Sequence, residues 1–188
     1  MKMLVFVPKV TGRVMYVFDL VLRQLLGIEY DLTTDAEQFK AFEEPKLHYG
    51  MQRLGDEPFV KAVDILFERH IHEQSFRTVE FEGTVAPYAV YGQGNLLPFD
   101  VFAASFFLVS RYEEYLSQVR DQYGRFRAES TWMFENGMLQ KPLVNIWALA
   151  LGNKLKGDGP VLLWCAIHEP QAFNLVCNRS LAGEKFRC

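Results

Sequence analysis

The sequence predicts an α/β fold in which helices flank a mixed, mainly parallel sheet. Residues 3–7 form an apolar run rich in valine, which is typical of a strand covered by helices on both faces. Residues 28–32 alternate between apolar and polar side chains, which indicates a second strand. A helical pattern separates the two runs, so residues 3–32 predict a βαβ opening with a right-handed crossover.

The helix of this opening has clear ends. Thr11 is a favourable N-cap, and Gly27 is typical of the residue that follows a helix. Between them, apolar residues recur at the three- and four-residue spacing of one helix face: Val14, Val17, Phe18, Val21, Leu22, Leu25 and Leu26. We therefore expect one amphipathic helix here, with the strand before it central in the sheet.

The middle of the chain carries weaker signals. Pro and Gly residues punctuate it, leaving a predicted strand at residues 46–49 and a short apolar segment at 60–67. Strand-like patterns lie on either side of Gly83, at residues 78–82 and 85–91. These two patterns favour an antiparallel pair at one side of the sheet.

Two more helices are expected in the second half of the chain. Asp100 is a favourable N-cap for a helix over residues 101–116, whose first two turns are apolar nearly all round. Pro142 begins the other helix, which carries an apolar stripe and ends between residues 152 and 159. A short strand is predicted around residues 131–134, just before a turn dipeptide.

The chain is expected to divide into one domain and a tail. Residues 1–156 form the predicted α/β domain. At residue 157 a cluster of Gly, Asp and Pro begins, and the composition changes beyond it. Residues 157–188 are therefore expected to be an atypical C-terminal tail.

The composition excludes several classes of protein. Hydrophobic residues make up 49% of the 188 residues and aromatic residues 14%, which is too apolar for a disordered chain. The net charge of −3 argues against a nucleic-acid partner, because such binding depends on neutralising phosphates. The first apolar run is shorter than a signal-peptide core, and no run approaches the roughly 20 residues of a membrane span. We therefore expect a cytoplasmic protein with neither a nucleic-acid nor a membrane partner.

One group of histidines invites a metal interpretation that its spacing does not support. His70 and His72 lie two positions apart, near Glu68 and Glu73. On a helix the two rings would face different directions, and on a strand they would lack a third ligand. We expect solvated polar side chains here, without a metal or another cofactor.

The cysteines do not form a zinc or disulfide pattern. Cys165, Cys177 and Cys188 lie close to the end of the sequence, with His168 among them. Zinc sites show pairs of cysteines only a few positions apart, and these are much more widely spaced. We expect incidental thiols and no disulfide framework in the main domain.

Charged residues around the predicted 101–116 helix are the candidate contacts for a ligand or partner. Asp100 precedes this helix, Arg111, Glu113 and Glu114 lie in its second half, and Arg125 follows in the next loop. Paired carboxylates can act as a general acid and base, but capping by Asp100 and ion pairs of the others explain them structurally. If the chain binds a ligand, we expect it at these residues and the loops over 120–137.

Aromatic residues could form a platform for sugar rings, whose apolar faces stack on flat side chains. Trp147 lies in an apolar helical stripe and is expected in the core. Core packing is also the default for Tyr112 and Tyr115. Trp132, near the predicted turn, is the aromatic residue expected to be exposed.

Three segments of the chain carry a family resemblance. They include the strings Phe99-Asp100-x-Phe102-Ala103-Ala104-Ser105 and Ser110-Arg111-Tyr112-Glu113-Glu114-Tyr115, and the block at residues 139–147. With the opening segment, they resemble an uncharacterised bacterial module that precedes a polysaccharide deacetylase domain. The resemblance covers about residues 1–155.

The resemblance implies no catalytic residue in this chain. In that family the chemistry belongs to the following domain, where an Asp and two His hold a metal that activates water. The family continues into that domain, whereas residues 157–188 depart from its pattern. A truncated gene, a change of reading frame or a short paralogue would each account for the departure.

These observations lead to one expected function and two alternatives. We expect a non-catalytic accessory domain that docks to a deacetylase catalytic domain or presents glycan to it, and that self-associates through an exposed apolar patch. One alternative is a small α/β enzyme with a carboxylate site around Asp100, Glu113 and Glu114. The other is a regulatory domain that binds a small ligand at the helix N-terminus near residues 11–13.

Overall fold

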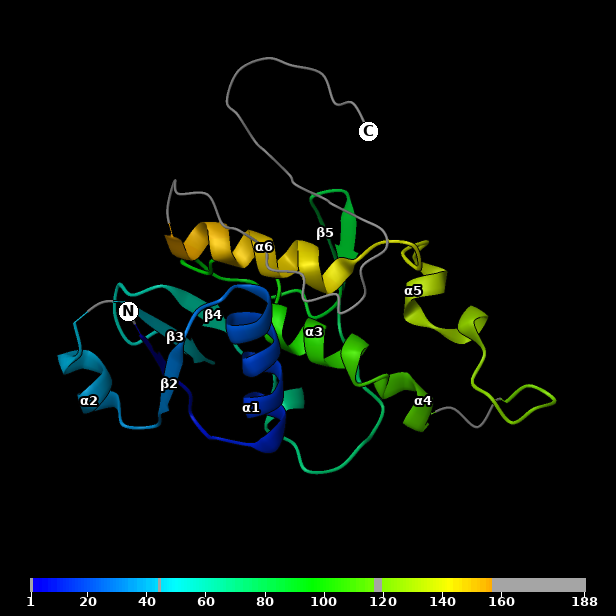
Figure 1. Cartoon of the computed structure of the whole chain (residues 1–188), viewed down its shortest axis with the longest axis horizontal. Coiled ribbons are helices and arrows are strands. Elements are labelled where there is room, and N and C mark those ends of the chain that lie inside the picture. The colour runs from blue at the N-terminus through cyan, green and yellow to red at the C-terminus, as the bar shows by residue number, and fades with distance from the viewer. Residues whose placement is uncertain (1, 44, 117–119, 157–188) are drawn as a thin grey trace, which may run out of the picture.

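The computed structural model describes residues 2–43, 45–116 and 120–156 and has an α/β architecture (Figure 1). Its main sheet has four parallel strands in the order β2-β1-β3-β4. The strands are β1 (Met3–Phe6), β2 (Tyr30–Thr33), β3 (Lys46–Gly50) and β4 (Phe59–Lys61). This sheet confirms the predicted fold class, the βαβ opening and the central position of the first strand.

The two faces of the sheet are covered by different helices. Val5 and Val7 belong to the main hydrophobic core, which also contains the buried residues of the helices beginning at residues 12 and 101. On the opposite face, Phe6 packs against Phe39 with ring centroids 5.6 Å apart. Phe39 lies in α2 (Ala36–Ala41), a short helix capped by Asp35 that the sequence pattern did not predict.

The first helix begins as predicted and then changes its winding. In α1 (Gly12–Phe18) the Thr11 hydroxyl accepts a hydrogen bond from the Val14 N–H at 3.1 Å, which confirms the N-cap. The chain continues as a wider π-helix, η1 (Asp19–Leu25), and Gly27 follows with a φ of 63°. Val21 and Leu22 of η1 are buried like the apolar residues of α1, so the apolar stripe continues across the change. Residue periodicity alone therefore does not reveal the i→i+5 hydrogen bonds of the π-helix.

The predicted antiparallel pair forms a small sheet of its own. Strands β5 (Val79–Phe81) and β6 (Thr84–Ala86) pair across a turn with Gly83 at φ 71°. This confirms the antiparallel pairing, and the pair forms a separate two-stranded sheet beside the main one. The second strand is also shorter than predicted, because the backbone turns to a φ of 61° at Tyr88.

The helix predicted over 101–116 is broken into two. α3 (Val101–Val109) is buried over its first seven residues, and α4 (Tyr112–Leu116) follows after a change of direction. Arg111 between them has a φ of 51°, in the left-handed region, so the helical hydrogen bonds cannot continue through it. No Gly or Pro marks this break, which explains why the sequence did not predict it.

The segment after residue 127 is helical where a strand was expected. A short 3-10 turn, η3 (Ala128–Ser130), leads into α5 (Trp132–Glu135), and the Thr131 hydroxyl caps α5 by accepting from the Phe134 N–H at 3.1 Å. The β-branched and aromatic residues here resemble a strand, but this local cap determines the helix. Trp132 is 8% exposed, so its expected exposure was also wrong.

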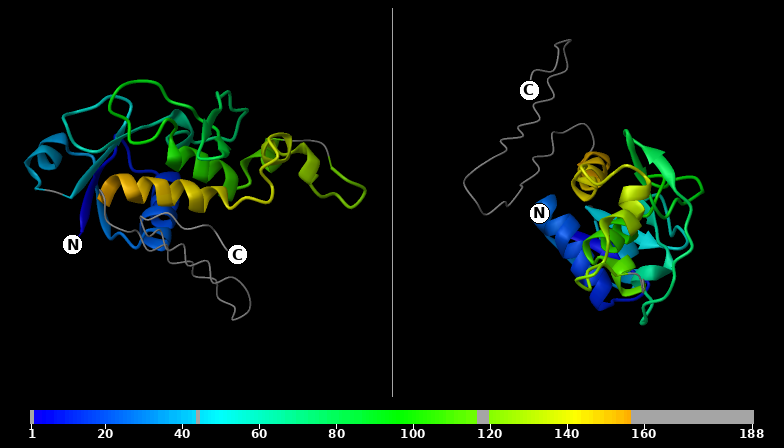
Figure 2. Two further views of the ribbon diagram at one scale, coloured as in Figure 1. Left: turned by 90° about the horizontal axis from the view of Figure 1, so that it is seen from above. Right: turned by 90° about the vertical axis from the view of Figure 1, so that its right-hand side faces the viewer.

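The last described helix, α6 (Leu143–Lys156), agrees with its prediction. Its buried stripe contains Trp147, whose indole N–H donates to the Thr84 hydroxyl at 3.2 Å. Figures 1 and 2 show α6 crossing beside α3, and the continuous helix formed by α1 and η1 packs against both of them. The predicted tail at 157–188, with its cysteines and His168, lies outside the described residues.

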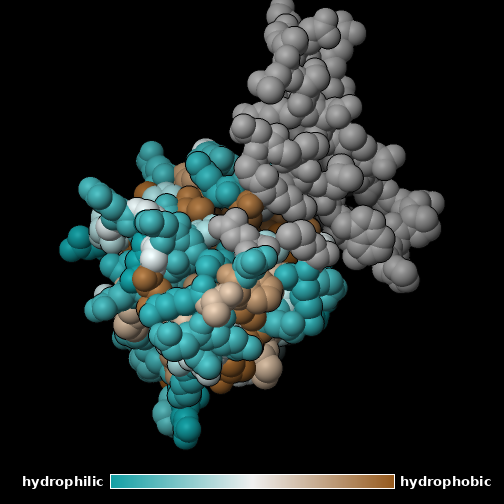
Figure 3. All heavy atoms as spheres, turned by 90° about the vertical axis from the view of Figure 1, so that its left-hand side faces the viewer, coloured by the Kyte–Doolittle hydropathy of each residue, from teal (hydrophilic) through white to brown (hydrophobic). Residues whose placement is uncertain are grey.

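None of the described helices is long and apolar enough to cross a membrane. On the face shown in Figure 3, the described hydrophobic residues form small groups between hydrophilic ones. Exposed apolar side chains such as Met15 and Tyr16, each 51% exposed, lie on α1.

Candidate functional site

Asp100 is a buried structural centre. Its side chain is fully buried and accepts four hydrogen bonds. One oxygen accepts from the backbone N–H groups of Phe102 and Ala103 at 3.1 and 3.0 Å, which is the predicted helix cap. The other accepts from the Tyr49 hydroxyl and the Val63 N–H, both at 2.8 Å. Asp100 therefore joins α3 to β3 and to the loop after β4, and it lines neither of the hollows described below.

Burial raises the pKa of Asp100 to about 6, even though its four hydrogen bonds lower it. The cost of removing a carboxylate from water therefore outweighs the stabilisation from its donors. Such a raised pKa is found in catalytic acids, but it is also found in buried structural groups. With every partner internal, Asp100 fits the structural interpretation.

Glu113 and Glu114 face different parts of the molecule. The Glu113 carboxylate accepts from the Trp132 backbone N–H at 2.8 Å, at the start of α5. Burial raises the pKa of Glu113. Glu114 forms an ion pair with Arg111 instead. The structure thus does not bring Asp100, Glu113 and Glu114 together in one cavity.

Three of the five predicted contact residues surround one hollow of about 920 Å³ between α4 and the loop at 120–129. They are Arg111, Glu114 and Arg125. Arg120 and Arg127 also line this hollow, which we call the arginine hollow. The structure brings these residues around one hollow, whereas the sequence alone places them only near the end of a helix and in the next loop.

The loop beside the arginine hollow is built around Asp121. Its carboxylate accepts from the backbone N–H groups of Tyr123 and Arg125 at 2.8 and 2.9 Å and pairs with the Arg125 guanidinium at 3.0 Å. These donors lower the pKa of Asp121. Arg125 also lies over the Tyr123 ring, 4.9 Å from its centroid, and Tyr123 is 71% exposed. The hollow thus presents guanidinium groups, carboxylates and exposed aromatic surface together.

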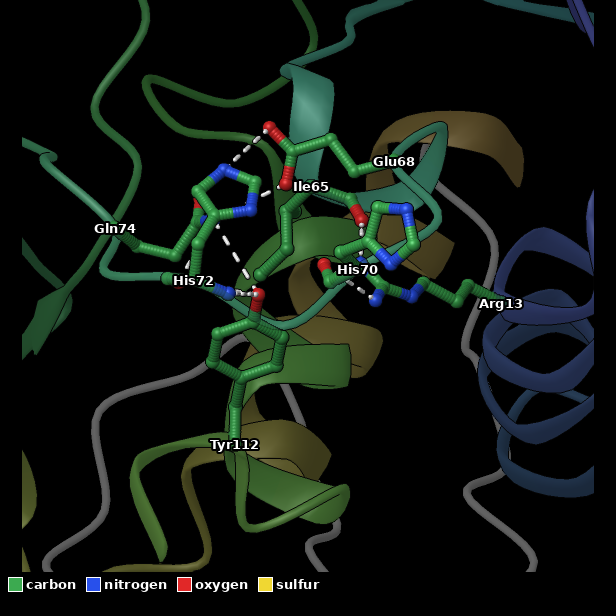
Figure 4. Close-up of polar contacts among 7 residues, drawn as sticks. All are labelled: Arg13, Ile65, Glu68, His70, His72, Gln74 and Tyr112. Carbon is green, nitrogen blue, oxygen red and sulfur yellow. Dashed lines mark hydrogen bonds and ion pairs between the residues drawn. The ribbon is translucent and has the colours of Figure 1, made fainter. Parts of the chain in front are cut away.

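A second group of polar residues lies where the chain leaves β4, at the carboxyl end of the main sheet (Figure 4). Glu68 pairs with His72 at 3.3 Å and accepts from the Gln74 amide at 3.1 Å. The Tyr112 hydroxyl donates to the His72 carbonyl and accepts from its N–H, both at 3.2 Å. Tyr112, on α4, therefore holds the 68–74 loop in place, and the break at Arg111 is what turns its ring toward that loop.

A pocket of about 410 Å³ lies beside this group. Its walls come from residues 63–65, Glu68 and residues 72–77, together with Tyr88 and Ala89. We call it the Tyr88 pocket. From the sequence, Glu68 and His72 are expected to be solvated polar residues and Tyr88 is not singled out, because the pocket forms between segments that are distant in the sequence. The spacing of Glu68, His72 and Gln74 is the only local signal that could have indicated it.

The helix N-terminus proposed for a small ligand is occupied by the protein itself. The Thr11 hydroxyl donates to the Leu66 carbonyl at 2.6 Å. The Arg13 guanidinium donates to the carbonyls of Ile65 and His70 at 2.6 and 3.1 Å (Figure 4). These bonds attach the loop after β4 to α1, so the structure gives these side chains an internal role.

The geometry also bears on metal binding. Within residues 2–43, 45–116 and 120–156, no three His, Cys, Asp or Glu side chains are grouped so that they could hold a metal ion. The His70 carbonyl bonds Arg13, whereas the His72 ring pairs with Glu68, so the two histidines take part in different contacts.

The comparisons with known proteins give a family but no activity. Neither a search of curated proteins nor a search of solved structures found a match. Nothing found in them links the chain to polysaccharide deacetylases. A family model described as a family of unknown function, DUF7033, matches residues 3–160. The match spans the whole described α/β domain, and the chain belongs to the DUF7033 family.

Proposed function

We propose that this chain is a non-catalytic accessory domain that binds a glycan in the arginine hollow and presents it to a catalytic domain. The observation that carries the proposal is the convergence of Arg111, Glu114 and Arg125 around one hollow of about 920 Å³. The resemblance to a module that precedes polysaccharide deacetylases suggests the class of that catalytic partner. The proposal needs no catalytic residue in the described domain.

The chemistry of the hollow suits a glycan. Guanidinium and carboxylate groups form paired hydrogen bonds with neighbouring sugar hydroxyls, and an exposed aromatic ring offers a flat apolar face. Arg125 and Tyr123 supply both features from one turn, with the guanidinium already stacked on the ring. Asp121 fixes that turn through two backbone hydrogen bonds, so a ligand would not have to order it.

The positions of the carboxylates favour binding over catalysis. General acid–base chemistry needs a carboxyl group within hydrogen-bonding reach of the substrate. Asp100 is enclosed and accepts four internal bonds, and Glu113 is engaged by the Trp132 N–H. The small-enzyme alternative would require these groups to leave their partners, so we favour the accessory role.

The test combines binding with coupled activity. The full chain is titrated with a soluble acetylated chitin oligosaccharide by calorimetry, and it is also mixed with a separately expressed deacetylase domain and a divalent metal. We expect binding, no deacetylation by the chain alone, and a changed deacetylase rate on mixing. Deacetylation by the chain alone, or no binding together with no rate change, would overturn the proposal.

Arg125→Ala is the informative variant, and Arg23→Ala is its matched control. Arg23 also pairs with an aspartate four residues earlier and lies over a tyrosine ring, at 5.3 Å from the Tyr30 centroid, but on η1. Arg125→Ala should weaken glycan binding about fivefold to tenfold, as expected for one charge-assisted hydrogen bond at an exposed site. Arg23→Ala should leave binding unchanged, and equal losses in both variants would show only a general charge effect.

A further inference from the structure

The charges around the arginine hollow do not balance. Its lining carries four guanidinium groups and three carboxylates. The guanidinium groups belong to Arg111, Arg120, Arg125 and Arg127. The whole chain has a net charge of −3, and the lining of the Tyr88 pocket carries three carboxylates and one guanidinium group. The positive excess is therefore a local property of the arginine hollow.

Two of the four arginines form ion pairs with carboxylates of the same lining. Arg111 pairs with Glu114, three residues later, and Arg125 pairs with Asp121 at 3.0 Å. Each pair is neutral as a whole, so it can offer hydrogen bonds to a ligand but adds no net charge. The excess therefore resides in Arg120 and Arg127.

Arg120 is held in position by neutral groups. Its guanidinium donates to the backbone carbonyl of Glu114 at 2.8 Å and lies over the Phe126 ring, 5.9 Å from the centroid. Its backbone also forms an antiparallel bridge with that of Phe126. A guanidinium group has five N–H donors, so these contacts leave donors and the whole positive charge for an anion. Because the side chain is already oriented, binding an anion costs it less conformational entropy.

Arg127 is an exposed cation of the same lining. Within the part of the chain that the structure describes, neither Arg120 nor Arg127 forms an ion pair, and neither does Glu129, the third carboxylate of the hollow. A guanidinium group binds a carboxylate through two parallel hydrogen bonds, and a free carboxylate accepts from hydroxyl groups. The ligand that suits all three residues carries both carboxylates and hydroxyl groups.

We propose that the glycan bound in the arginine hollow is acidic, with carboxylate groups on its sugar rings that Arg120 and Arg127 bind. This inference rests on the proposed glycan-binding function and names the class of glycan. An acidic sugar carries its carboxylate beside hydroxyl groups, so it can meet the two guanidinium groups and the Glu129 carboxylate together. A peptide of aspartate or glutamate would match the arginines, but it has no hydroxyl groups for Glu129, which would repel it.

The test compares three forms of one oligosaccharide. An acetylated chitin oligosaccharide, its derivative oxidised to the carboxylate at C6, and the methyl ester of that derivative are titrated into the full chain by calorimetry. The carboxylated form should bind about tenfold more tightly than either neutral form, as expected for two exposed ion pairs worth about threefold each.

The other outcomes separate the two proposals. Equal affinities for the three forms would overturn the acidic class and leave the glycan site standing. No binding of any form, together with no effect on a deacetylase domain, would overturn the proposed function and this inference with it. A glutamate oligopeptide that bound as tightly as the carboxylated form would show that the hollow recognises charge alone, and it would overturn the acidic glycan.

Three variants locate the preference in the hollow. Arg120→Gln and Arg127→Gln should each reduce the preference for the carboxylated form from about tenfold to about threefold. Arg77→Gln is the matched control, because Arg77 is also exposed and lies 5.9 Å from a ring centroid, that of Tyr91, but does not line the arginine hollow. It should keep the full preference. An equal reduction in Arg77→Gln, or an undiminished preference in both other variants, would overturn the proposal.

Discussion

Asp100 and Tyr88 are neighbours that satisfy their buried polar groups in opposite ways. They are joined by a 3.0 Å hydrogen bond from the Asp100 N–H to the Tyr88 carbonyl, and they are 0% and 4% exposed. The Asp100 carboxylate has four internal donors, whereas the Tyr88 hydroxyl has no partner within the described residues. A raised pKa is common to both, so the pKa alone does not distinguish a buried group with hydrogen-bond partners from one without them.

The comparison also explains the motif that carries the family resemblance. In the string from Phe99 to Ser105, every side chain is fully buried. Asp100 caps α3, and Ala103 and Ala104 are small enough for neighbouring helices to pack closely on it. Phe102 packs edge to face against Phe18, with ring centroids 4.1 Å apart. The string thus serves packing and helix capping, and Asp100 lines neither the arginine hollow nor the Tyr88 pocket.

The largest expected effect comes from removing the Asp100 carboxylate. Asp100→Ala would leave the Tyr49 hydroxyl and three backbone N–H groups without their acceptor, so we expect a loss of about 3 kcal/mol in the free energy of unfolding. Asp35→Ala is the matched control, because Asp35 caps the exposed helix α2 with two similar bonds, at 2.9 and 3.2 Å. It should cost about 1 kcal/mol. Urea denaturation of both variants would measure this, and equal losses would contradict the structural role.

The next effect is a pH dependence with a definite sign. The Asp100 pKa of about 6 in the folded state lies above its ordinary value of 3.8. Between these values the folded state binds more protons than the unfolded state, so stability falls as the pH rises from 4 to 6. We expect wild type to lose of order 2 kcal/mol over this range relative to Asp100→Asn, which does not titrate.

Urea denaturation of both proteins at several pH values would measure that difference. Because Asp100→Asn retains the other titrating groups, the subtraction isolates Asp100. A constant difference would show that Asp100 does not titrate in this range. A wild type that gained stability relative to the variant as the pH rose would show a lowered pKa and would contradict the dominance of burial.

The smallest expected change in stability tests the comparison of a partnered with an unpartnered buried group most directly. Tyr88→Phe and Tyr49→Phe delete the same atom from two buried rings. Tyr49 loses its 2.8 Å bond to Asp100, so we expect about 1–2 kcal/mol of destabilisation. Tyr88 loses no partner, so we expect no loss, or a gain of up to about 1 kcal/mol. Thermal unfolding of both variants would decide this, and a clear loss in Tyr88→Phe would mean that its hydroxyl has a structural partner such as a buried water.

Local signals in the sequence predicted much of the fold. The valine-rich run at residues 3–7, the Thr11 and Asp100 caps, and the stripe of the last helix each correspond to what the structure shows. These predictions are confirmed because burial patterns and helix caps depend on residues only a few positions apart. The short strand expected at 131–134 failed for the same reason, since the Thr131 cap overrode the composition of the segment.

The candidate sites were only partly accessible from the sequence. Arg111, Glu114 and Arg125 were singled out because they are charged and close to the end of an apolar helix, and they do share a hollow. Tyr88 was not, because its left-handed backbone and its unpartnered hydroxyl follow from contacts with residues 76, 77, 100 and 107. No local pattern encodes such contacts.

The sequence by itself determined the α/β class, the parallel opening, the main caps and the charged segment that lines the arginine hollow. The tertiary structure decided the break at Arg111, the internal use of Thr11 and Arg13, and the Tyr88 pocket. The physical reason is the range of the interactions. Periodicity and capping act within one or two turns of chain, whereas strained backbones and pockets exist only where distant segments pack together.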